Sequence, residues 1–326
     1  MSNQTTQQPS IVIISPALAA ANNGNWQTAK RWQAMLSGHY RVEIMQSWNG
    51  EPFDAMLALH ARRSADTIAR WAAAHPDKLL VLALTGTDLY RDIAVDPLAQ
   101  QSLQLAQRLI VLQELGSRSL PAEFRGKCSV VFQSTPRRLS VQKSTQELRA
   151  LMVGHLRAEK SPQTYFAAAR ALAHRPDIVL EHIGGVLDPV LGEVARQLAA
   201  EVPNYRYLGE LSHEQTLEYV THAHVLVHPS QLEGGAHVVM EAVMCGTPVL
   251  ASRIDGNVGM LGEGYGGYFP LGDSQTLANM LLRCKNEPQF LDHLNKQCAL
   301  RSPLFEPQAE QAALLQIVSK IISQDI

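Results

Sequence analysis

Short apolar runs alternate with longer amphipathic segments along most of the chain. Residues 11–15 and 55–59 are apolar runs of strand length. Residues 26–37 place tryptophan, alanine, methionine and leucine at the spacing of one helix face. Strand and helix then follow each other repeatedly, which is typical of an α/β protein built on parallel sheets.

The same pattern predicts the other elements in both halves of the chain. In the first half we expect further strands at 42–45, 78–84, 109–112 and 129–132, with a helix at 64–75. In the second half we expect strands at 151–154, 178–183, 205–208, 224–228 and 249–252, with helices at 189–201, 213–222 and 237–245. Another helix is expected to begin at Pro162 with Ser161 as its N-cap.

Residues 134–147 interrupt this alternation with proline, arginine, serine and glutamine and with little apolar content. We interpret them as a linker between two doubly wound domains, at 1–140 and 141–304. Residues 305–326 contain a final amphipathic helix. Each parallel sheet is expected to bind its ligand beyond the carboxyl ends of its strands.

Composition excludes several classes of function. The chain has 28 lysines and arginines against 30 aspartates and glutamates, a net charge of −2, which does not suit a general nucleic-acid binder. Its apolar runs are far shorter than the roughly 18 residues of a membrane span. The polar first ten residues lack the features of a signal peptide, and the four cysteines include no CxxC pair. We therefore expect a cytoplasmic protein with reduced thiols that does not associate with a membrane.

Residues 229–252 hold the most informative pattern. They read as the end of a strand, a loop with Glu233, Gly234 and Gly235, a helix containing Glu241, a glycine stop and another strand. Glycines let a ligand approach the backbone, and the helix N-terminus favours anionic or hydroxyl-rich ligands. Two carboxylates taken alone are more often ordinary surface residues. The surrounding glycines favour a functional interpretation.

This segment resembles the signature of the retaining nucleotide-sugar glycosyltransferases of the GT-B fold, in which two glutamates are separated by seven residues. The resemblance implies two Rossmann-like domains that face each other across a cleft. It implies that Glu241 binds the ribose of a nucleoside diphosphate, and that Glu233 and the backbone of Gly234, Gly235, Ala236 and His237 hold the sugar. The final helix would cross back to the first domain, as in other members.

Two further segments carry the same resemblance. Residues 209–215, with Leu211, resemble the loop that contacts uracil, and residues 152–160, with Gly154, resemble the diphosphate-binding loop. In that loop His155 stands where the family usually has arginine, while Lys160 is retained. Arg157 is the candidate replacement cation, with a solvated loop arginine as the alternative.

A departing UDP gains negative charge, so a cationic clamp is the main catalytic need. We therefore assign catalytic roles to Lys160, Arg157 and Glu233. The sequence contains no Asp-x-Asp triplet, so we expect neither a metal ion nor another cofactor.

Polar groups follow three strands of the first half. They are Asn23, Gly24 and Asn25 after the first strand, His60, Arg62 and Arg63 after another, and Thr85 and Thr87 after a third. Because the ends of parallel strands meet at one sheet edge, we expect these groups to bind the acceptor there. A single strand-end arginine is more often a surface ion pair, but two arginines with two threonines favour an anion.

Four segments resemble one group within this family, the selenosugar synthases of selenoneine biosynthesis. They are residues 14–29, 59–64, 84–90 and 154–162. This resemblance implies transfer of N-acetylglucosamine or glucose from a UDP-sugar to selenophosphate, giving a 1-selenosugar, UDP and phosphate. Selenium is a strong nucleophile, so a general base is less needed than for a hydroxyl, although Asp88 or His60 could serve.

Two alternatives remain open at this point. One is an ordinary GT-B hexosyltransferase that acts on a hydroxyl acceptor. The other is a catalytically inactive nucleotide-sugar-binding module, which His155 in place of arginine favours and Glu233, Glu241 and Lys160 oppose.

Overall fold

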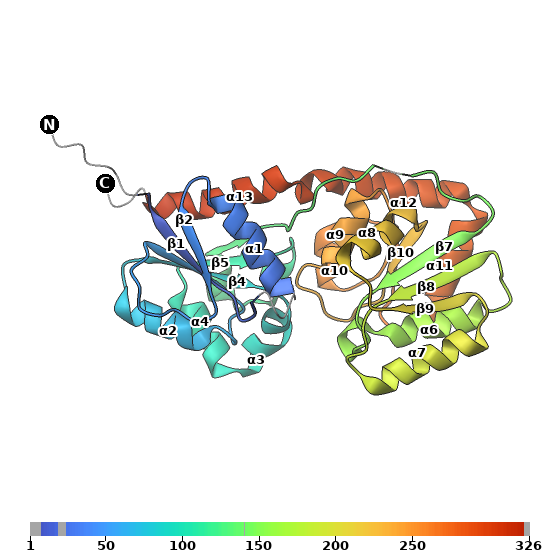
Figure 1. Ribbon diagram of the computed structural model, residues 1–326, viewed down its shortest axis with the longest axis horizontal. Coiled ribbons are helices and arrows are strands. Elements are labelled where there is room, and N and C mark those ends of the chain that lie inside the picture. The colour runs from blue at the N-terminus through green and yellow to red at the C-terminus, as the bar shows by residue number, and fades with distance from the viewer. Residues whose placement is uncertain (1–7, 19–23, 140, 323–326) are drawn as a thin grey trace. The chain divides into compact units, whose positions relative to one another are not determined.

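The computed structural model of the protein describes residues 8–18, 24–139 and 141–322. The chain forms two compact units (Figure 1). The first combines residues up to Gln133 with those from Pro307 onward, and the second is Ser134–Glu306. Residues 134–139 and 141–147, which were interpreted as a linker, run without helix or strand at the start of the second unit.

The first unit is built on a parallel six-stranded sheet in the order β2-β1-β3-β4-β5-β6. Its strands are β1 (Ser10–Ile14), β2 (Arg41–Met45), β3 (Ala55–Leu59), β4 (Leu79–Leu84), β5 (Arg108–Val111) and β6 (Cys128–Val130). Its helices are α1 (Gly24–Leu36), α2 (Ala65–Ala74), α3 (Ile93–Val95), α4 (Pro97–Leu105), α5 (Ala122–Arg125) and α13 (Pro307–Ile322), with the short helical turns η2 (Asp88–Asp92) and η3 (Gly116–Ser119).

The central strands β1, β3 and β4 are buried on both faces of this sheet, and successive side chains of a strand point to opposite faces. Ile11 and Ile13 pack in the cluster that holds apolar residues of α1 and α13. Val12 and Ile14 pack in the other cluster, with residues of α2 and α4. Covering helices on two faces explain why the strands are continuously apolar rather than alternating.

The C-terminal helix α13 belongs to the first unit and contacts α1. Glu310 of α13 is 1% exposed and accepts hydrogen bonds from Arg31 Nε at 2.8 Å and Trp32 Nε1 at 2.6 Å. Leu314 and Val318 continue the contact into the apolar cluster beneath. A buried ion pair and an apolar stripe therefore hold the last helix against the first.

The second unit repeats the architecture with a parallel sheet in the order β12-β11-β10-β7-β8-β9. Its strands are β7 (Leu148–Val153), β8 (Ile178–Ile183), β9 (Tyr205–Gly209), β10 (Val225–His228), β11 (Val249–Ser252) and β12 (Tyr268–Phe269). Its helices are α6 (Pro162–Ala171), α7 (Pro189–Glu201), α8 (His213–His222), α9 (His237–Met244), α10 (Asp255–Leu261), α11 (Ser274–Asn286) and α12 (Pro288–Arg301), with the 3₁₀ turns η4 (Ala158–Lys160) and η5 (Ser302–Phe305).

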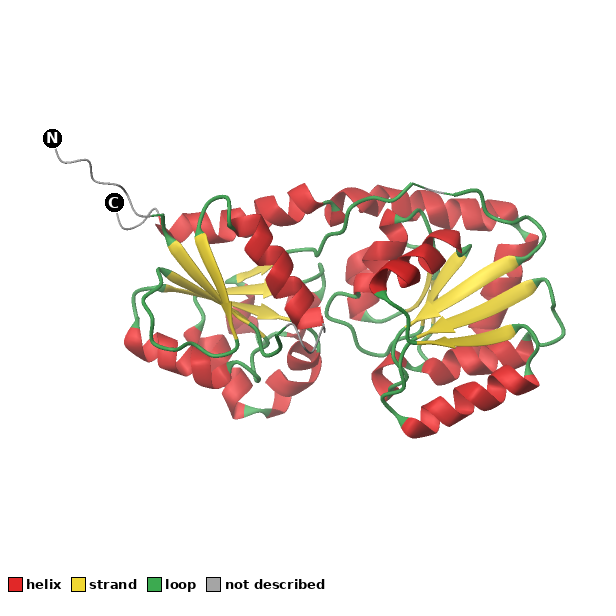
Figure 2. Cartoon of the chain, viewed as in Figure 1, coloured by secondary structure: helices red, strands yellow, loops and turns green. Residues whose placement is uncertain are grey.

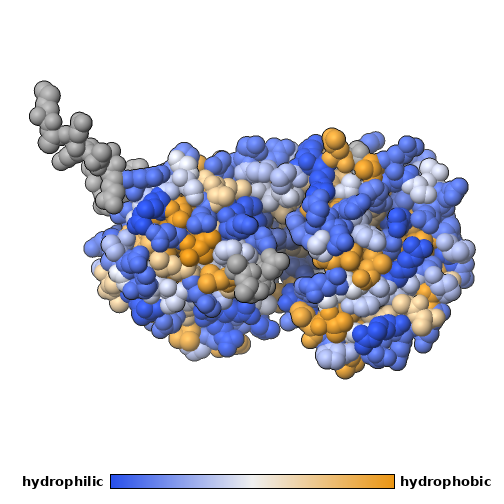
Figure 3. Space-filling view, in the orientation of Figure 1, coloured by the Kyte–Doolittle hydropathy of each residue, from blue (hydrophilic) through white to orange (hydrophobic). Residues whose placement is uncertain are grey.

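Helices flank the strands of each sheet (Figure 2). The face of the molecule in Figure 3 is mainly hydrophilic, with apolar side chains in small groups. The helices thus cover the apolar faces of both sheets. Within the described ranges, no helix has both the length and the apolarity needed to cross a bilayer.

Local chemistry sets several helix starts. Asp188 caps α7 by accepting from the amides of Val190 and Leu191, and Pro189 occupies the first helical position. Ser212 and Gln215 form a reciprocal capping box at α8.

The predicted cap at Ser161 is wrong. Its backbone is left-handed, with a φ of 47°, and its hydroxyl makes no capping hydrogen bond. It lies 3.2 Å from Thr164 Oγ1 instead. The position follows directly on the turn η4, and that turn imposes a conformation from which the side chain cannot reach the amides of α6.

Candidate functional site

The donor-site residues predicted from sequence all lie in the second unit, in loops that follow the strands. Gly154, His155, Arg157 and Lys160 follow β7, Leu211 follows β9, Glu233 to Ala236 follow β10, and His237 and Glu241 lie on α9. Because the sheet is parallel, β7, β8, β9 and β10 end at one edge. The sheet topology therefore gathers segments that are far apart in sequence.

Lys160 and Glu233 form an ion pair at this edge. Lys160 Nζ donates to Glu233 Oε1 at 2.6 Å, and the two side chains are 17% and 11% exposed. His228, the last residue of β10, is fully buried beside them. Its Nε2 lies 3.1 Å from the same oxygen, but the contact does not meet the geometry of a hydrogen bond. One lysine and one histidine thus surround a single carboxylate.

The charge state of this cluster follows from burial and from the neighbouring cation. Burial by itself raises the pKa of the Glu233 carboxyl, but the charge and hydrogen bond of Lys160 hold the pKa well below its usual range. Burial lowers the pKa of His228. Glu233 is therefore an anion and Lys160 its counter-ion, while His228 is neutral near pH 7.

Backbone contacts fix Glu233 from two sides. The amide of Gln231 donates to Glu159 O at 2.9 Å, and its side chain donates to Ala158 O at 2.6 Å, so the two loops are joined. On the other side, a Cβ on Gly256 would lie 2.1 Å from Glu233 O. Only glycine allows the first turn of α10 to pack this closely against the loop.

His155 lies on the diphosphate-type loop as a neutral ring. Its Nδ1 accepts a hydrogen bond from the Gly185 amide at 2.9 Å, which requires a lone pair on that nitrogen. The remaining proton is then on Nε2. In this arrangement His155 offers a hydrogen-bond donor but does not replace the charge of the usual arginine.

Arg157 is the other candidate on this loop for that charge. Its side chain is exposed and has no ion-pair partner among the residues that the structure describes. It stands three positions before Lys160, whose own charge is matched by Glu233. An anion bound at this loop would find the unmatched charge on Arg157.

Glu241 is buried rather than placed on a polar helix face. It is 8% exposed, and its Oε1 lies 2.7 Å from His213 Nε2. The hydrogen bond to Glu241 raises the pKa of His213, and the negative charge of Glu241 adds to this effect. Residue 213 lies in the segment whose resemblance suggested uracil contact, so the structure joins that segment to the expected ribose carboxylate.

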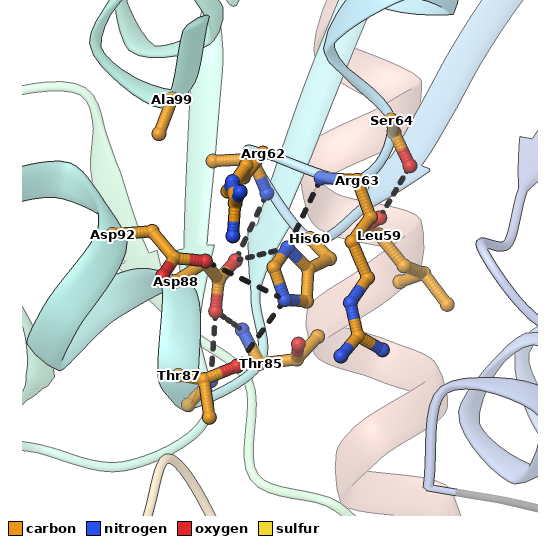
Figure 4. A network of polar contacts seen from close by, with 12 residues as sticks. Leu59, His60, Arg62, Arg63, Ser64, Thr85, Thr87, Asp88, Asp92 and Ala99 are labelled. Carbon is orange, nitrogen blue, oxygen red and sulfur yellow. Dashed lines mark hydrogen bonds and ion pairs between the residues drawn. The ribbon is translucent and has the colours of Figure 1, made fainter. Parts of the chain in front are cut away.

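The acceptor-site residues predicted from sequence lie in the first unit. His60 follows β3, and Thr85 and Thr87 follow β4, next to each other in the sheet. Asp88 organises their loops (Figure 4): its carboxylate is fully buried and accepts from the amides of Ala61, Thr85 and Gly86 at 2.9–3.0 Å. Three amide hydrogen bonds and complete burial give Asp88 a structural role, and it is not placed as the general base.

His60 is held beside Asp88 in a left-handed conformation, with a φ of 71°. Its Nδ1 accepts from the Arg63 amide at 3.3 Å, and its Nε2 lies 3.2 Å from Thr87 Oγ1. Burial lowers the pKa of His60, with Arg63 adding to that effect and Asp88 opposing it. The ring is therefore neutral near pH 7.

The two arginines of this loop differ. Arg62 Nε lies 2.7 Å from Asp96 Oδ2, whereas Arg63 is exposed and has no ion-pair partner within the described part of the chain. Figure 4 shows the Arg63 guanidinium beside His60 with no contact drawn to it. Of the two arginines, Arg63 is thus available and Arg62 is engaged.

The positions of the remaining acceptor-side residues say less about acceptor binding. Gly24 and Asn25 form the first turn of α1, where Gly24 O accepts from Thr28 Oγ1 at 2.8 Å. Asn23 lies outside the described residues. Among those residues, no three His, Cys, Asp or Glu side chains are grouped as metal ligands.

Sequence reasoning missed three contributors. Asp96 and His213 gave no signal of their own, because they matter only as partners of Arg62 and Glu241. His182 on β8 resembled any residue of a buried strand. The Gly184–Gly185 pair directly after β8 was a usable signal, since paired glycines at a strand end often mark a close backbone approach.

Comparison with known proteins places the chain in a family. The family model described as "Glycosyl transferases group 1" matches residues 136–299, half of the chain. A D-inositol 3-phosphate glycosyltransferase of Nocardiopsis dassonvillei is 31% identical over 180 residues, which are 51% of this chain and 39% of that protein. The aligned region thus spans about two fifths of that relative.

Solved structures share the fold over nearly the whole chain. A sucrose-phosphate synthase of Thermosynechococcus elongatus gives a TM-score of 0.75 at 18% identity, covering 98% of this chain and all of that one. HepE of Anabaena, solved in complex with UDP and glucose, gives 0.71 at 16% identity, covering 95% and 99%. The predicted α/β class with two doubly wound sheets of the GT-B type is confirmed. By its fold and by the match over residues 136–299, the chain belongs to the group 1 glycosyl transferases.

Proposed function

We propose that the protein transfers a hexosyl group, N-acetylglucosamine or glucose, from a UDP-sugar to selenophosphate. The observation that carries the proposal is the part-buried Lys160–Glu233 ion pair at the strand ends of the second unit, with the unmatched charge of Arg157 on the same loop. A site that holds a sugar needs a fixed carboxylate for its hydroxyls, and a site that releases UDP needs cations for the diphosphate.

The donor side is supported by the distribution of charge. Glu233 is rigid and ionised, so it can accept hydrogen bonds from sugar hydroxyls, and Glu241 can do the same for ribose hydroxyls. Arg157 and Lys160 would stabilise the leaving diphosphate, with His155 Nε2 as a neutral donor. The structural neighbour HepE was solved with UDP and glucose, which agrees with a UDP-sugar donor.

The acceptor side is supported by Arg63 and its setting. An exposed arginine without an ion-pair partner in the described chain, next to a neutral histidine and two threonines, suits a small anion. The segments that resemble selenosugar synthases include these residues. The nucleophile would be the selenium of selenophosphate, which needs no general base, and Asp88 is not placed to act as one.

The proposed reaction has two steps. Selenium forms a bond to the anomeric carbon while the bond from that carbon to the UDP oxygen breaks, and UDP leaves with the electron pair. Water then cleaves the phosphorus–selenium bond, giving phosphate and a 1-selenosugar, with the water proton taken by selenium or solvent. Charge on the leaving UDP is what Arg157 and Lys160 would offset.

One specific observation favours a second candidate acceptor. The curated relative is named for D-inositol 3-phosphate, a hydroxyl acceptor that also carries a phosphate. Arg63 would suit that phosphate equally well. In that case a general base is required. His60 is the candidate in the first unit, and it could take a proton only if its Nδ1 is released from the Arg63 amide.

The test is UDP release from UDP-N-acetylglucosamine and UDP-glucose, measured without oxygen because selenophosphate oxidises easily. Each donor is incubated alone, with selenophosphate, with phosphate and with D-inositol 3-phosphate, and product masses are read in parallel. Selenophosphate-dependent UDP with a selenium-containing sugar supports the proposal. UDP release only with D-inositol 3-phosphate would show that this compound, and not selenophosphate, is the acceptor. UDP-sugar binding without UDP release under any condition would show that the protein is a nucleotide-sugar-binding module.

A further inference from the structure

His182 is a buried histidine whose two nitrogens are both engaged. It lies on β8 with no exposed surface. Its Nε2 lies 3.1 Å from Gly154 O, and its Nδ1 lies 3.1 Å from Tyr205 Oη. Rings surround the imidazole with centroids at 5.5–6.4 Å, those of Tyr165, Phe166 and Tyr207. Aromatic packing and two hydrogen bonds therefore fix its orientation.

The protons of these bonds can be assigned. A carbonyl oxygen only accepts, so Nε2 must carry the proton given to Gly154 O. Nδ1 then has a lone pair and accepts from the Tyr205 hydroxyl. Burial lowers the pKa of His182 to about 4, so the neutral ring that this arrangement requires is the form present near pH 7.

The Gly154 carbonyl determines the direction of the next amide. In a trans peptide the carbonyl and the following N–H point in opposite directions. Gly154 N and Leu156 N donate to Ile183 O and Gly185 O, both contacts with the neighbouring β8 segment. Within the described chain the His155 amide between them has no such acceptor. With Gly154 O held by His182, that N–H is directed away from the buried ring.

Two further groups hold the same peptide in place. A Cβ on Gly184 would lie 2.0 Å from Gly154 O, so the peptide can occupy this position only against a glycine. Tyr207 Oη donates to Gly184 O at 2.7 Å and fixes that glycine from β9. On the other side, Lys160 Cγ and Cδ would lie 3.4 Å from a Cβ on Gly154, so Lys160 packs over the loop.

From this geometry we infer that His182 is a positioning residue that aims the His155 amide at the diphosphate of the donor. The inference rests on the proposed function, because it concerns the nucleotide that the second unit binds. A backbone N–H beside Lys160 and Arg157 gives a directional hydrogen bond that flexible cations do not supply. His182 never touches the nucleotide and acts only through the Gly154–His155 peptide.

The test compares UDP with uridine, because uridine lacks the phosphates that the His155 amide would bind. Dissociation constants are measured by titration calorimetry for the unaltered protein and for H182F, H182Q, Y207F and Y165F. H182F removes both ring hydrogen bonds, whereas the side-chain amide of H182Q can still donate to Gly154 O. Y165F is the matched control, since it loses a buried hydroxyl bonded to Ala150 O and Glu181 O but leaves the loop intact.

We expect H182F to weaken UDP binding about tenfold, the scale of one hydrogen bond to a charged group, with uridine binding little changed. H182Q should recover most of that loss, Y207F should shift UDP in the same direction, and Y165F should change neither ligand. Equal loss of UDP and uridine, unchanged UDP binding in H182F, or an equal effect of Y165F would each overturn the inference.

If H182F does not fold, H182Q and Y207F decide the question by the same ratio of UDP to uridine. Loss of UDP selectivity in Y207F with its retention in H182Q supports the inference, and unchanged selectivity in Y207F overturns it. If the unaltered protein binds no UDP, the proposed function fails and the inference fails with it.

Discussion

Lys160 Nζ lies 2.6 Å from Glu233 Oε1, although 73 positions separate the two residues in sequence. The lysine follows β7 and the glutamate follows β10, two strands that pair directly in the sheet. The ion pair holds Glu233 ionised and rigid, and it leaves Arg157 as the unmatched cation of the same loop. The geometry of this pair makes its energetic role testable.

Replacing Lys160 by methionine should destabilise the second unit by about 3 kcal/mol, because Glu233 would remain buried without its counter-ion. The double variant K160M/E233Q should recover most of this loss, since neither charge is then buried. Urea unfolding of the unaltered protein and both variants measures the difference. Glycosyl transfer should be lost in both variants, and equal stability of K160M and the double variant would contradict the role of the pair.

The pKa of His213 should depend on Glu241. The hydrogen bond to Glu241 raises it above the ordinary value of about 6.5. The pair therefore stabilises the fold fully below about pH 6.5 and loses this contribution as pH rises through the raised value. Because the His213 side chain is 70% exposed, solvent screening keeps the contribution below about 1 kcal/mol.

An NMR titration of the His213 ring protons measures this pKa directly. Glu241→Gln should lower it toward 6.5, because the main cause of the shift is removed. An unchanged His213 pKa in the Glu241→Gln variant would show that the pKa does not depend on Glu241.

Arg62 and Arg63 should contribute unequally to acceptor binding. Arg63→Ala should raise the acceptor KM about tenfold or more, because its charge is available to an anion. Arg62→Ala should change this KM much less, since Arg62 is already engaged by Asp96 at 2.7 Å. Steady-state kinetics at saturating UDP-sugar give both values, and the donor KM should be unchanged. A larger effect at Arg62 would reverse the assignment.

Glu310 should be a main determinant of how tightly α13 is held. Glu310→Gln removes the ion pair with Arg31 and weakens the bond to Trp32, at a cost of about 3 kcal/mol. Thermal unfolding and proteolysis of the C-terminal helix should both detect the change. Gln308→Ala, an exposed position two residues earlier on the same helix, is the control and should be neutral. If Glu310→Gln leaves the stability unchanged, the apolar stripe is sufficient by itself to hold α13 in place.

Element boundaries followed from the sequence wherever burial was strong. The ranges predicted for β3, β8, α7, α8 and β11 coincide with those of the structure. Each is an apolar strand or an amphipathic helix with a clear start or stop, such as Asp188–Pro189 before α7. Local chemistry and one buried face are enough to specify such elements.

Among the helices that were not predicted are α4, α11 and α12. Helices α4 and α12 bury only three residues each, so few apolar positions reveal their period. Helix α11 buries Leu277, Leu281 and Cys284 at helical spacing, a signal that was available in the sequence. Segment α11 owes its place to packing against α6, a contact between residues about a hundred positions apart. Weak periodicity combined with distant partners leaves little for a local pattern to report.

Candidate site residues were found by type and by place at strand ends, but their roles were not. Arg62 and Arg63 looked equivalent in sequence, and only Asp96 distinguishes them. Asp88 looked like a possible base, yet three amides from two loops occupy its carboxylate. His155 looked like a weak cation, and Gly185 makes it a neutral ring.

The sequence by itself determined the α/β class, the repeated strand–helix order and the glycine-rich segments around Glu233, because periodicity and turn chemistry are local properties. The tertiary structure alone decided which polar groups pair with each other. Lys160 with Glu233, His213 with Glu241 and His182 with Gly154 each join residues from different strands or loops. Such pairs are set by sheet order, which brings distant strand ends together, and no local pattern encodes their geometry.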